Sequence, residues 1–239
     1  MTLTKINKES IWPEQIVYED NHIMVINKMP SEIVQGDKTG DMPLSDKIKN
    51  FIKERDHKPG NVFCGVIHRL DRPVSGLIIF AKTSKALSRF NELFREKTIH
   101  KTYLAVVKNK PPKQAGSLVH YLIKNEKTNM SKAFDKPNSQ TLKAELEYEL
   151  MASSDNYHLL KIKLLTGRHH QIRCQLSAIG CPIKGDLKYG FGRTNEGGFI
   201  HLHSYLLEFV HPVKQEPLTV KALPVSDDAV WKYFAKVIN

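Results

Sequence analysis

The sequence has few of the features that mark secreted, membrane-spanning or metal-stapled proteins. It contains three cysteines in 239 residues and no Cys-x-x-Cys pair, so neither a disulfide framework nor a zinc knuckle is expected. Its longest apolar runs, such as Leu77 to Ala81, are far shorter than the ~20 residues of a membrane helix. The first ten residues lack the apolar stretch and cleavage site of a secretory signal. We therefore expect a cytoplasmic protein that has neither disulfides nor a zinc knuckle and does not span a membrane.

Internal repeats and low-complexity tracts are also missing, which excludes solenoid architectures. The composition is that of an ordinary globular chain, with 41% hydrophobic and 26% charged residues. A chain of this length can form a core without disulfide or metal support. We expect a single domain over residues 1–239, with the Pro- and Lys-containing segment 108–116 as a surface loop.

Positive charge is the property in clear excess, and it is concentrated in two segments. The net charge is +11 at pH 7. Residues 82–113 carry nine Lys or Arg against two Glu, and residues 161–193 carry seven against one Asp. Such clustering favours a polyanionic partner such as nucleic acid, with a solvated basic surface as the alternative.

Hydrophobic periodicity indicates more strands than helices. Residues 141–150 alternate strictly between apolar and polar side chains, which predicts a half-buried strand. Further strands are expected at 17–27, 76–82, 101–107, 157–165 and 199–209. Helices are expected after the cap at Thr83 or Ser84, over 171–179, and after Ser226. Because strands and helices do not alternate regularly, the predicted fold class is α+β with a mixed, largely antiparallel sheet and flanking helices.

A polar loop between two apolar segments carries the first candidate catalytic group. Asp71 lies between Arg69 and Arg72 in the string H-R-L-D-R-P-V-S-G, residues 68–76. Flanking positive charge favours an ionised carboxylate, which could serve as a nucleophile or base. The alternative is a structural turn in which Asp71 accepts backbone N–H groups.

Two further segments carry candidate site residues. Residues 166–173, T-G-R-H-H-Q-I-R, follow a strand and lead into a helix, where basic side chains and N–H groups suit a phosphate or carboxylate. Arg168 and Arg173 could instead be surface charge. Tyr103 lies on an alternating strand, where an aromatic residue is more often part of the core.

Taken together, these segments resemble the RluA-type pseudouridine synthase family. The family signature His-Arg-Leu-Asp-x-x-Thr-Ser-Gly is matched by residues 68–76, except that Val74 replaces threonine. The signatures Gly-Arg-x-His-Gln-Ile-Arg and Gly-x-Pro-Ile-x-Gly-Asp-x-x-Tyr-Gly are matched by residues 167–173 and 180–190. The resemblance extends from about residue 16 to about residue 225. About 15 residues precede the first matched strand, so we expect the form without an N-terminal accessory RNA-binding domain.

The resemblance implies a fold, a reaction and a set of catalytic residues. The family core is a largely antiparallel sheet with a basic central cleft, and it isomerises uridine in RNA without cofactor or metal. The glycosidic bond breaks, and the uracil turns and rejoins through carbon 5. Asp71 matches the catalytic aspartate, which either attacks the nucleoside or abstracts a sugar proton. Tyr103 matches the tyrosine that stacks on the base, and Arg168 the arginine that keeps the aspartate ionised.

The implied partner is structured RNA, ribosomal or transfer, bound by a monomer. Arg69 matches the residue that fills the gap left when the target nucleotide flips out of the RNA, which a buried base requires. The residues expected to contact the RNA are His68, Arg69, Lys82, Arg89, Lys101, His170, Gln171 and Arg173. Two departures from the family pattern, Val74 and Gln175, are expected to change loop support rather than abolish the chemistry.

Two other classes of protein are weighed against this one. A zinc hydrolase could use His201 and His203, which face the same way on a strand, with the 169–170 histidines and Asp71. No third ligand has the spacing of a known site. A non-catalytic RNA-binding or chaperone module is the other alternative. The presence of Asp71 together with Tyr103 and Arg168 argues against it, because a pure binder needs no such set.

Overall fold

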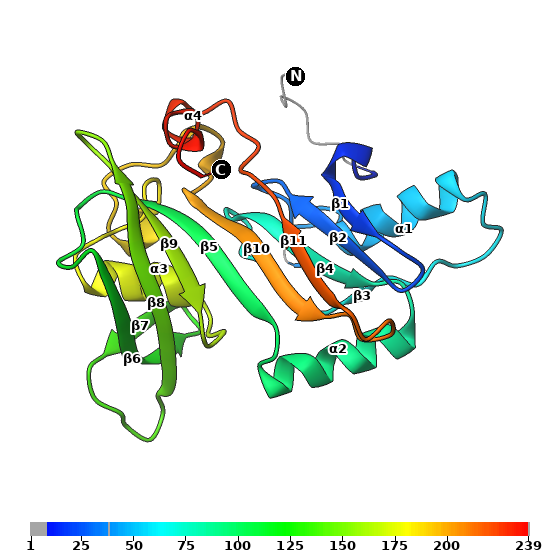
Figure 1. Ribbon diagram of the computed structural model, residues 1–239, viewed down its shortest axis with the longest axis horizontal. Helices are drawn as coiled ribbons and strands as arrows, with labels where there is room; N and C mark the ends of the chain where they lie inside the picture. The colour runs from blue at the N-terminus through cyan, green and yellow to red at the C-terminus, as the bar shows by residue number, and fades with distance from the viewer. Residues whose placement is uncertain (1–8, 38, 239) are drawn as a thin grey trace. The chain divides into compact units, whose positions relative to one another are not determined.

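The computed structural model describes residues 9–37 and 39–238, and the chain divides into two compact units (Figure 1). Unit 1 consists of the described residues up to Ile99 together with Ser204–Ala229. Unit 2 consists of His100–His203 and the described residues from Val230 on. None of the described helices is both long and apolar enough to span a bilayer.

Unit 1 is built around a largely antiparallel sheet. Its strands are β1 (Ile16–Glu19), β2 (Ile23–Lys28), β3 (Gly65–Val66), β4 (Ser75–Ala81), most of β10 (Leu202–Val210), and β11 (Pro217–Lys221). The order is β1-β2-β4-β10, with β11 paired to β10 and β3 paired to β4. Strands β2 and β4 are neighbours in the middle of this sheet and are buried at every position, which explains their nearly continuous apolar sequences.

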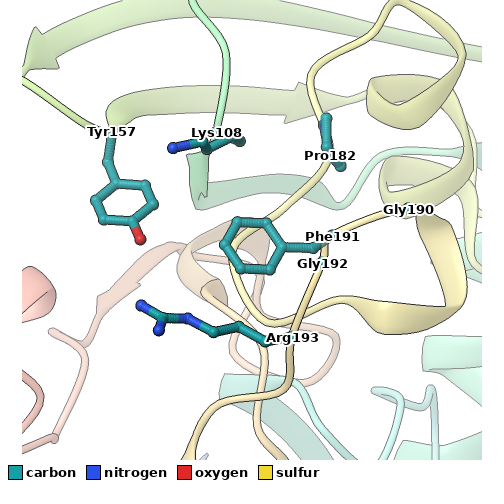
Figure 2. A pocket seen from close by; sticks show the side chains of 7 residues that line it. All are labelled: Lys108, Tyr157, Pro182, Gly190, Phe191, Gly192 and Arg193. Carbon is teal, nitrogen blue, oxygen red and sulfur yellow. The ribbon is translucent and has the colours of Figure 1, made fainter.

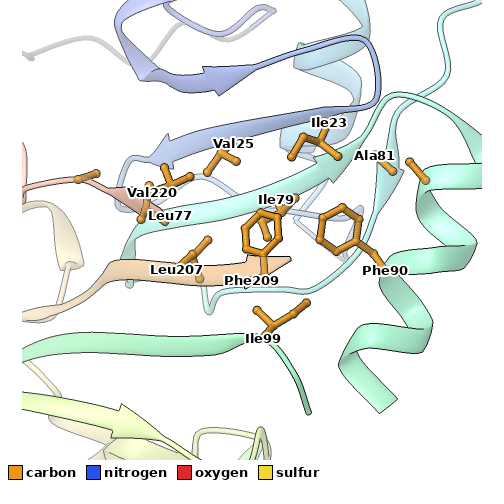
Figure 3. Packing of buried hydrophobic residues seen from close by; sticks show 12 residues of the cluster. Ile23, Val25, Leu77, Ile79, Ala81, Phe90, Ile99, Leu207, Phe209 and Val220 are labelled. Carbon is orange, nitrogen blue, oxygen red and sulfur yellow. The ribbon is translucent and has the colours of Figure 1, made fainter. Parts of the chain in front are cut away.

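The core of unit 1 lies between this sheet and helix α2 (Ser84–Glu96); helix α1 (Leu44–Arg55) and the short 3₁₀ helix η1 (Pro13–Gln15) complete the unit. Helix α2 begins at its predicted cap, where the Thr83 hydroxyl accepts the N–H of Ala86 at 3.1 Å. Its apolar stripe faces the sheet, and the Phe90 ring meets the edge of Phe209 at 5.4 Å between centroids (Figure 3). Burying this stripe stabilises the helix more than its own propensity does.

Unit 2 contains a second antiparallel arrangement, in the order β5-β9-β8-β6-β7. Its strands are β5 (His100–Val107), β6 (Ala115–Asn125), β7 (Met130–Phe134), β8 (Leu142–Ser153) and β9 (His158–Leu164). Helix α3 (Gln171–Ala178) packs on β6 and β7, with Leu122, Ala144, Cys174 and Tyr189 forming a small core. Two 3₁₀ helices, η2 (Leu187–Tyr189) and η3 (Glu196–Gly198), and helix α4 (Ala229–Ala235) follow.

The predicted fold class, α+β with a largely antiparallel sheet, is confirmed, as are the helices after Thr83 and over 171–179. Other predictions were wrong in detail. The single strand expected at 17–27 is a hairpin of β1 and β2, because the Asp20 side chain accepts the N–H groups of His22 and Ile23 and forms a turn. The loop expected at 108–116 is shorter, because β6 already begins at Ala115. Strands β6, β7 and β11 and helix α1 were not predicted from the sequence. The single domain over 1–239 stays a prediction.

Candidate active site

The loop that carries Asp71 is held in a tight turn within unit 1. The N–H of Val74 donates to the Asp71 carbonyl at 3.0 Å, which closes the turn just before β4. Arg69 and Arg72 are exposed, Asp71 is half-buried, and Val74 is buried. The turn therefore fixes the backbone of Asp71, and Val74 contributes a backbone N–H that either valine or threonine can supply.

A buried lysine supports this turn from the neighbouring strand. Lys28, at the end of β2, is fully buried, and its Nζ donates to the carbonyls of Met29 at 2.9 Å and Arg72 at 3.2 Å. The N–H of Ser31 donates to the same Arg72 carbonyl at 2.8 Å. Burial lowers the pKa of Lys28 to about 7, against the opposing attraction of Glu32 and Asp71. The backbone directly after Asp71 is thus fixed by two donors from one segment.

That segment is itself anchored by a buried carboxylate. One oxygen of Glu32 accepts the N–H of Met29 at 3.0 Å and the amide of Gln15 at 2.9 Å. The other oxygen pairs with Lys47 on α1 at 3.2 Å, and both side chains are nearly inaccessible. Removing either partner of a buried pair leaves an uncompensated charge, so this pair should hold the segment 28–32 firmly.

Gly76 closes the loop at the start of β4 and cannot be replaced without distortion. Its φ is +111°, a region that side chains disfavour, and a Cβ built on it would lie 2.3 Å from the carbonyl oxygen of Ser204. The string of residues 68–76 therefore ends in glycine, because the backbone of β10 passes directly over Gly76.

In unit 2, Tyr103 lies in the middle of β5, opposite Ile162 of β9. Lys101 precedes it by two residues and shares its face of the strand. The Lys101 ammonium lies near Gly167, 3.6 Å from where a Cβ on that glycine would be. Tyr103, Lys101 and the 166–168 loop therefore belong to one region of unit 2.

Arg168 is exposed, and it forms one hydrogen bond through its backbone and one through its side chain. Its N–H donates to the Gln171 side-chain oxygen at 2.9 Å, and the Thr166 hydroxyl donates to that same oxygen at 2.8 Å. The Nε of Arg168 donates to the Lys143 carbonyl at 3.0 Å. Gln171 is buried, and these two hydrogen bonds to its side-chain oxygen fix the loop that carries Arg168.

Gln175 continues this support one turn further along α3. It is fully buried, and its side-chain oxygen accepts from Gln171 at 2.9 Å. Its amide nitrogen lies 3.1 Å from the Leu118 carbonyl and 3.2 Å from that of Ala144, which ties α3 to β6 and β8. The residue that departs from the family pattern is thus part of the frame beneath the Arg168 loop.

Several residues expected to contact RNA have partners inside the fold instead. Arg173 is buried and forms two charge-assisted bonds to Asp186, at 2.7 and 2.8 Å, and its guanidinium lies 5.0 Å from the centre of the Tyr189 ring. A bidentate buried pair of this kind fixes α3 against the chain around η2. Arg173 and Gln171 are both buried and support α3 and the loop before it. That they also contact RNA stays a prediction.

The other expected contacts are also engaged locally, to different degrees. His68 accepts the N–H of Ile79 at 3.0 Å, and Lys82 pairs with Glu19 and donates to the Asp20 carbonyl at 2.7 Å. Arg89 donates to the Pro212 carbonyl at 2.9 Å. His170, at the start of α3 with φ of +51°, lies 2.9 Å from the Tyr189 hydroxyl. Arg69 is exposed.

The zinc alternative finds no support in the part of the chain that the structure describes. No three His, Cys, Asp or Glu residues gather there as a metal site would require. His201 and His203 both lie against Trp231 of α4, with ring centroids 5.1 and 6.3 Å away. These two histidines therefore serve the packing of α4.

Comparison with known proteins assigns the class of enzyme. A sequence model described as RNA pseudouridylate synthase matches residues 22–178, more than half of the chain. The fold and the order of the motifs agree with that match. The chain therefore belongs to the RNA pseudouridylate synthase family, and it is an isomerase that converts uridine in RNA to pseudouridine.

Individual relatives give the same assignment. The ribosomal large subunit pseudouridine synthase C of Pasteurella multocida is 31% identical over 225 residues, covering 92% of this chain and 67% of the relative. The tRNA pseudouridine synthase C of Pectobacterium carotovorum is 29% identical over 236 residues, covering 91% of this chain and 60% of the relative. The solved human RNA pseudouridylate synthase domain containing 4 has a TM-score of 0.75 at 20% identity, covering 94% of this chain and 93% of that one, so the fold is shared.

Proposed function

We propose that this enzyme modifies a uridine in structured ribosomal or transfer RNA, with Asp71, Tyr103 and Arg168 acting on the target nucleotide. The observation that carries the proposal is the double anchoring of the backbone after Asp71, by Lys28 at 3.2 Å and by Ser31 at 2.8 Å. A half-buried carboxylate on such a fixed turn suits a group that must meet one reacting atom with defined geometry. Relatives named for ribosomal RNA and for tRNA support the substrate class.

The proposed chemistry is balanced within the nucleoside. The bond between N1 of uracil and C1′ of the sugar breaks, the C5–C1′ bond forms, and the proton on C5 leaves while N1 gains one. Asp71 starts the reaction, either by attack or by proton abstraction. Tyr103 stacks on the turned base, and Arg168 supplies the positive charge that compensates the Asp71 carboxylate.

RNA binding is proposed to rest on the basic residues that the fold leaves accessible. Flipping a base out of a helix costs a few kcal/mol, which phosphate contacts and stacking must offset. Arg69 and Arg168 are exposed and are proposed to contact the RNA. Further RNA contacts are proposed for five residues that are also engaged within the fold: His68, Lys82, Arg89, Lys101 and His170. The basic central cleft of the family stays a prediction.

The proposal extends to the cellular setting. Three unpaired thiols, Cys64, Cys174 and Cys181, support a reducing compartment such as the cytoplasm. We also propose that the enzyme acts as a monomer, which size-exclusion chromatography with light scattering would check.

The test is a comparison of pseudouridine positions across total RNA from cells with and without this protein. One or a few ribosomal or transfer RNA positions should lose pseudouridine in its absence and regain it when the parent protein is restored. Restoration by Asp71→Asn as well would contradict the catalytic assignment. An unchanged map would contradict the proposed substrate class.

A further inference from the structure

Unit 2 contains a pocket that has no role in the proposed reaction described above. It has a volume of about 300 Å³ and is lined by Lys108, Tyr157, Pro182, Gly190, Phe191, Gly192 and Arg193. Figure 2 shows the Tyr157 and Phe191 rings and the charged ends of Lys108 and Arg193 directed toward a common space. This volume is at the lower end of the range of about 300–1,000 Å³ typical of small-ligand sites.

The lining combines apolar surface with positive charge. Its rings and proline offer flat apolar contact, while two of the seven residues carry a cation and none carries an acid. Lys108 and Lys184 hold their ammonium groups 5.5 and 5.8 Å from the centre of the Tyr157 ring. Such cation–π contacts restrain flexible lysine side chains beside the pocket. The ligand that fits this chemistry has a flat aromatic part and a phosphate.

The pocket lies at a defined distance from Tyr103 along the same strands. Tyr103 is opposite Ile162, and Val107 is opposite His158, so Lys108 and Tyr157 each lie five residues beyond the Tyr103–Ile162 pair. At about 3.3 Å per residue, this separation is roughly 16 Å. A stacked strand that advances about 3.4 Å per nucleotide, the spacing along one strand of duplex DNA, would cover that distance in about five nucleotides.

We propose that this pocket binds one unpaired nucleotide of the RNA substrate, up to about five positions from the target uridine. The base packs against Tyr157, Phe191 and Pro182, and its phosphate is bound by Lys108 and Arg193. The inference rests on the proposed function for the identity of the substrate, but the binding chemistry is independent of catalysis. The pocket selects substrates in which the flanking nucleotide is unpaired.

The test measures binding of a fluorescein-labelled ten-nucleotide oligouridylate to the full chain, as a function of salt. Lys108→Gln and Arg193→Gln should each weaken binding about three- to tenfold and reduce the slope of log affinity against log salt by about 0.7, the value for one phosphate contact on a single strand. Lys53→Gln, an exposed lysine on α1, is the matched control and should change neither quantity. Unchanged affinity and slope in both pocket variants would overturn the proposal.

A second arm separates base contact from phosphate contact. Tyr157→Leu should weaken binding of the oligouridylate about tenfold, since stacking requires a base. It should weaken binding of the same oligonucleotide without bases much less, because there only the restraint on Lys108 is lost. Tyr233→Leu, an exposed aromatic on α4, is the control. If Tyr157→Leu and Tyr233→Leu change the affinity for the oligouridylate equally, with melting temperatures equal to that of the parent, the pocket binds phosphate without contacting a base. That result would contradict a nucleotide site.

Catalysis provides the last distinction. On an RNA substrate with an unpaired flank, Tyr157→Leu should raise KM several-fold and leave kcat near that of the parent, because the pocket does not touch the reacting atoms. If the parent forms no pseudouridine in any RNA, the proposed function fails, whereas the oligonucleotide results still decide the pocket.

Discussion

The Nζ of Lys28 lies 3.2 Å from the carbonyl oxygen of Arg72, the residue that directly follows Asp71. This contact joins two segments 44 residues apart in the sequence, and a fully buried ammonium makes it. Desolvating a charge is costly, and it is tolerated here because two carbonyls and the nearby carboxylates compensate it. The position of the proposed catalytic carboxylate thus depends on a residue outside its own motif.

Replacement of this lysine should change the pH dependence of stability. Burial lowers the pKa of Lys28 to about 7, whereas an unfolded lysine titrates near 10.4. Between these values the unfolded chain binds one more proton, so this group makes the free energy of unfolding rise with pH by up to about 1.4 kcal/mol per unit. Lys28→Met should lose that contribution. Urea unfolding between pH 7 and 9 measures it, and identical slopes for parent and variant would contradict the assignment.

Arg173 and Arg168 should differ in what their loss affects. Arg173→Gln breaks a buried bidentate pair with Asp186 and should cost about 3–5 kcal/mol of stability. Arg168→Gln removes an exposed side chain with one bond to a carbonyl, so it should cost less than about 1 kcal/mol while abolishing most activity. Chemical denaturation and a single-turnover assay on both variants check this. An Arg173→Gln variant that is as stable as the parent but fails to bind RNA would show that Arg173 acts as an RNA contact rather than as a support of the fold.

Helix α2 offers a similar comparison for RNA binding. Lys85 is exposed, whereas Arg89 donates to the Pro212 carbonyl at 2.9 Å. Lys85→Gln combined with Lys97→Asn should weaken RNA binding equally across sequences and flatten its salt dependence, with stability unchanged. Arg89→Gln should instead lower the free energy of unfolding by about 1 kcal/mol. If the lysine pair leaves affinity and salt slope unchanged, α2 does not contact the RNA.

Features set by local chemistry were predictable from the sequence. Helix α2 followed from the Thr83 cap and its apolar stripe, and β8 followed from strict alternation. Helix α1 was missed, although Leu44, Ile48 and Ile52 have helical spacing and are buried. Strands β6 and β7 were missed because most of their residues are at least partly exposed and apolar alternation is weak.

The site was predictable only where a motif carried it. The motifs pointed to Asp71, Arg168 and Arg173, but the contacts that hold the Asp71 turn and the Arg173 side chain join residues that are distant in sequence. Lys28 meets Arg72 across 44 residues, and Arg173 meets Asp186 across 13. In the sequence, a basic residue in the first turn of a helix, such as Arg173, indicates a phosphate contact. Its acidic partner Asp186 becomes known only from the structure. For Lys28, the sequence offered the signal of a charged residue at the end of an otherwise apolar strand.

The most direct measurement of the central claim is the single-turnover conversion of uridine to pseudouridine by Asp71→Asn, in an RNA that the parent enzyme modifies. The amide has nearly the shape of the carboxylate but cannot act as a nucleophile or base. The variant should keep the parent's melting temperature and RNA affinity, and it should form no pseudouridine above background. Conversion at a rate near that of the parent would show that Asp71 does not carry the chemistry and would contradict the account.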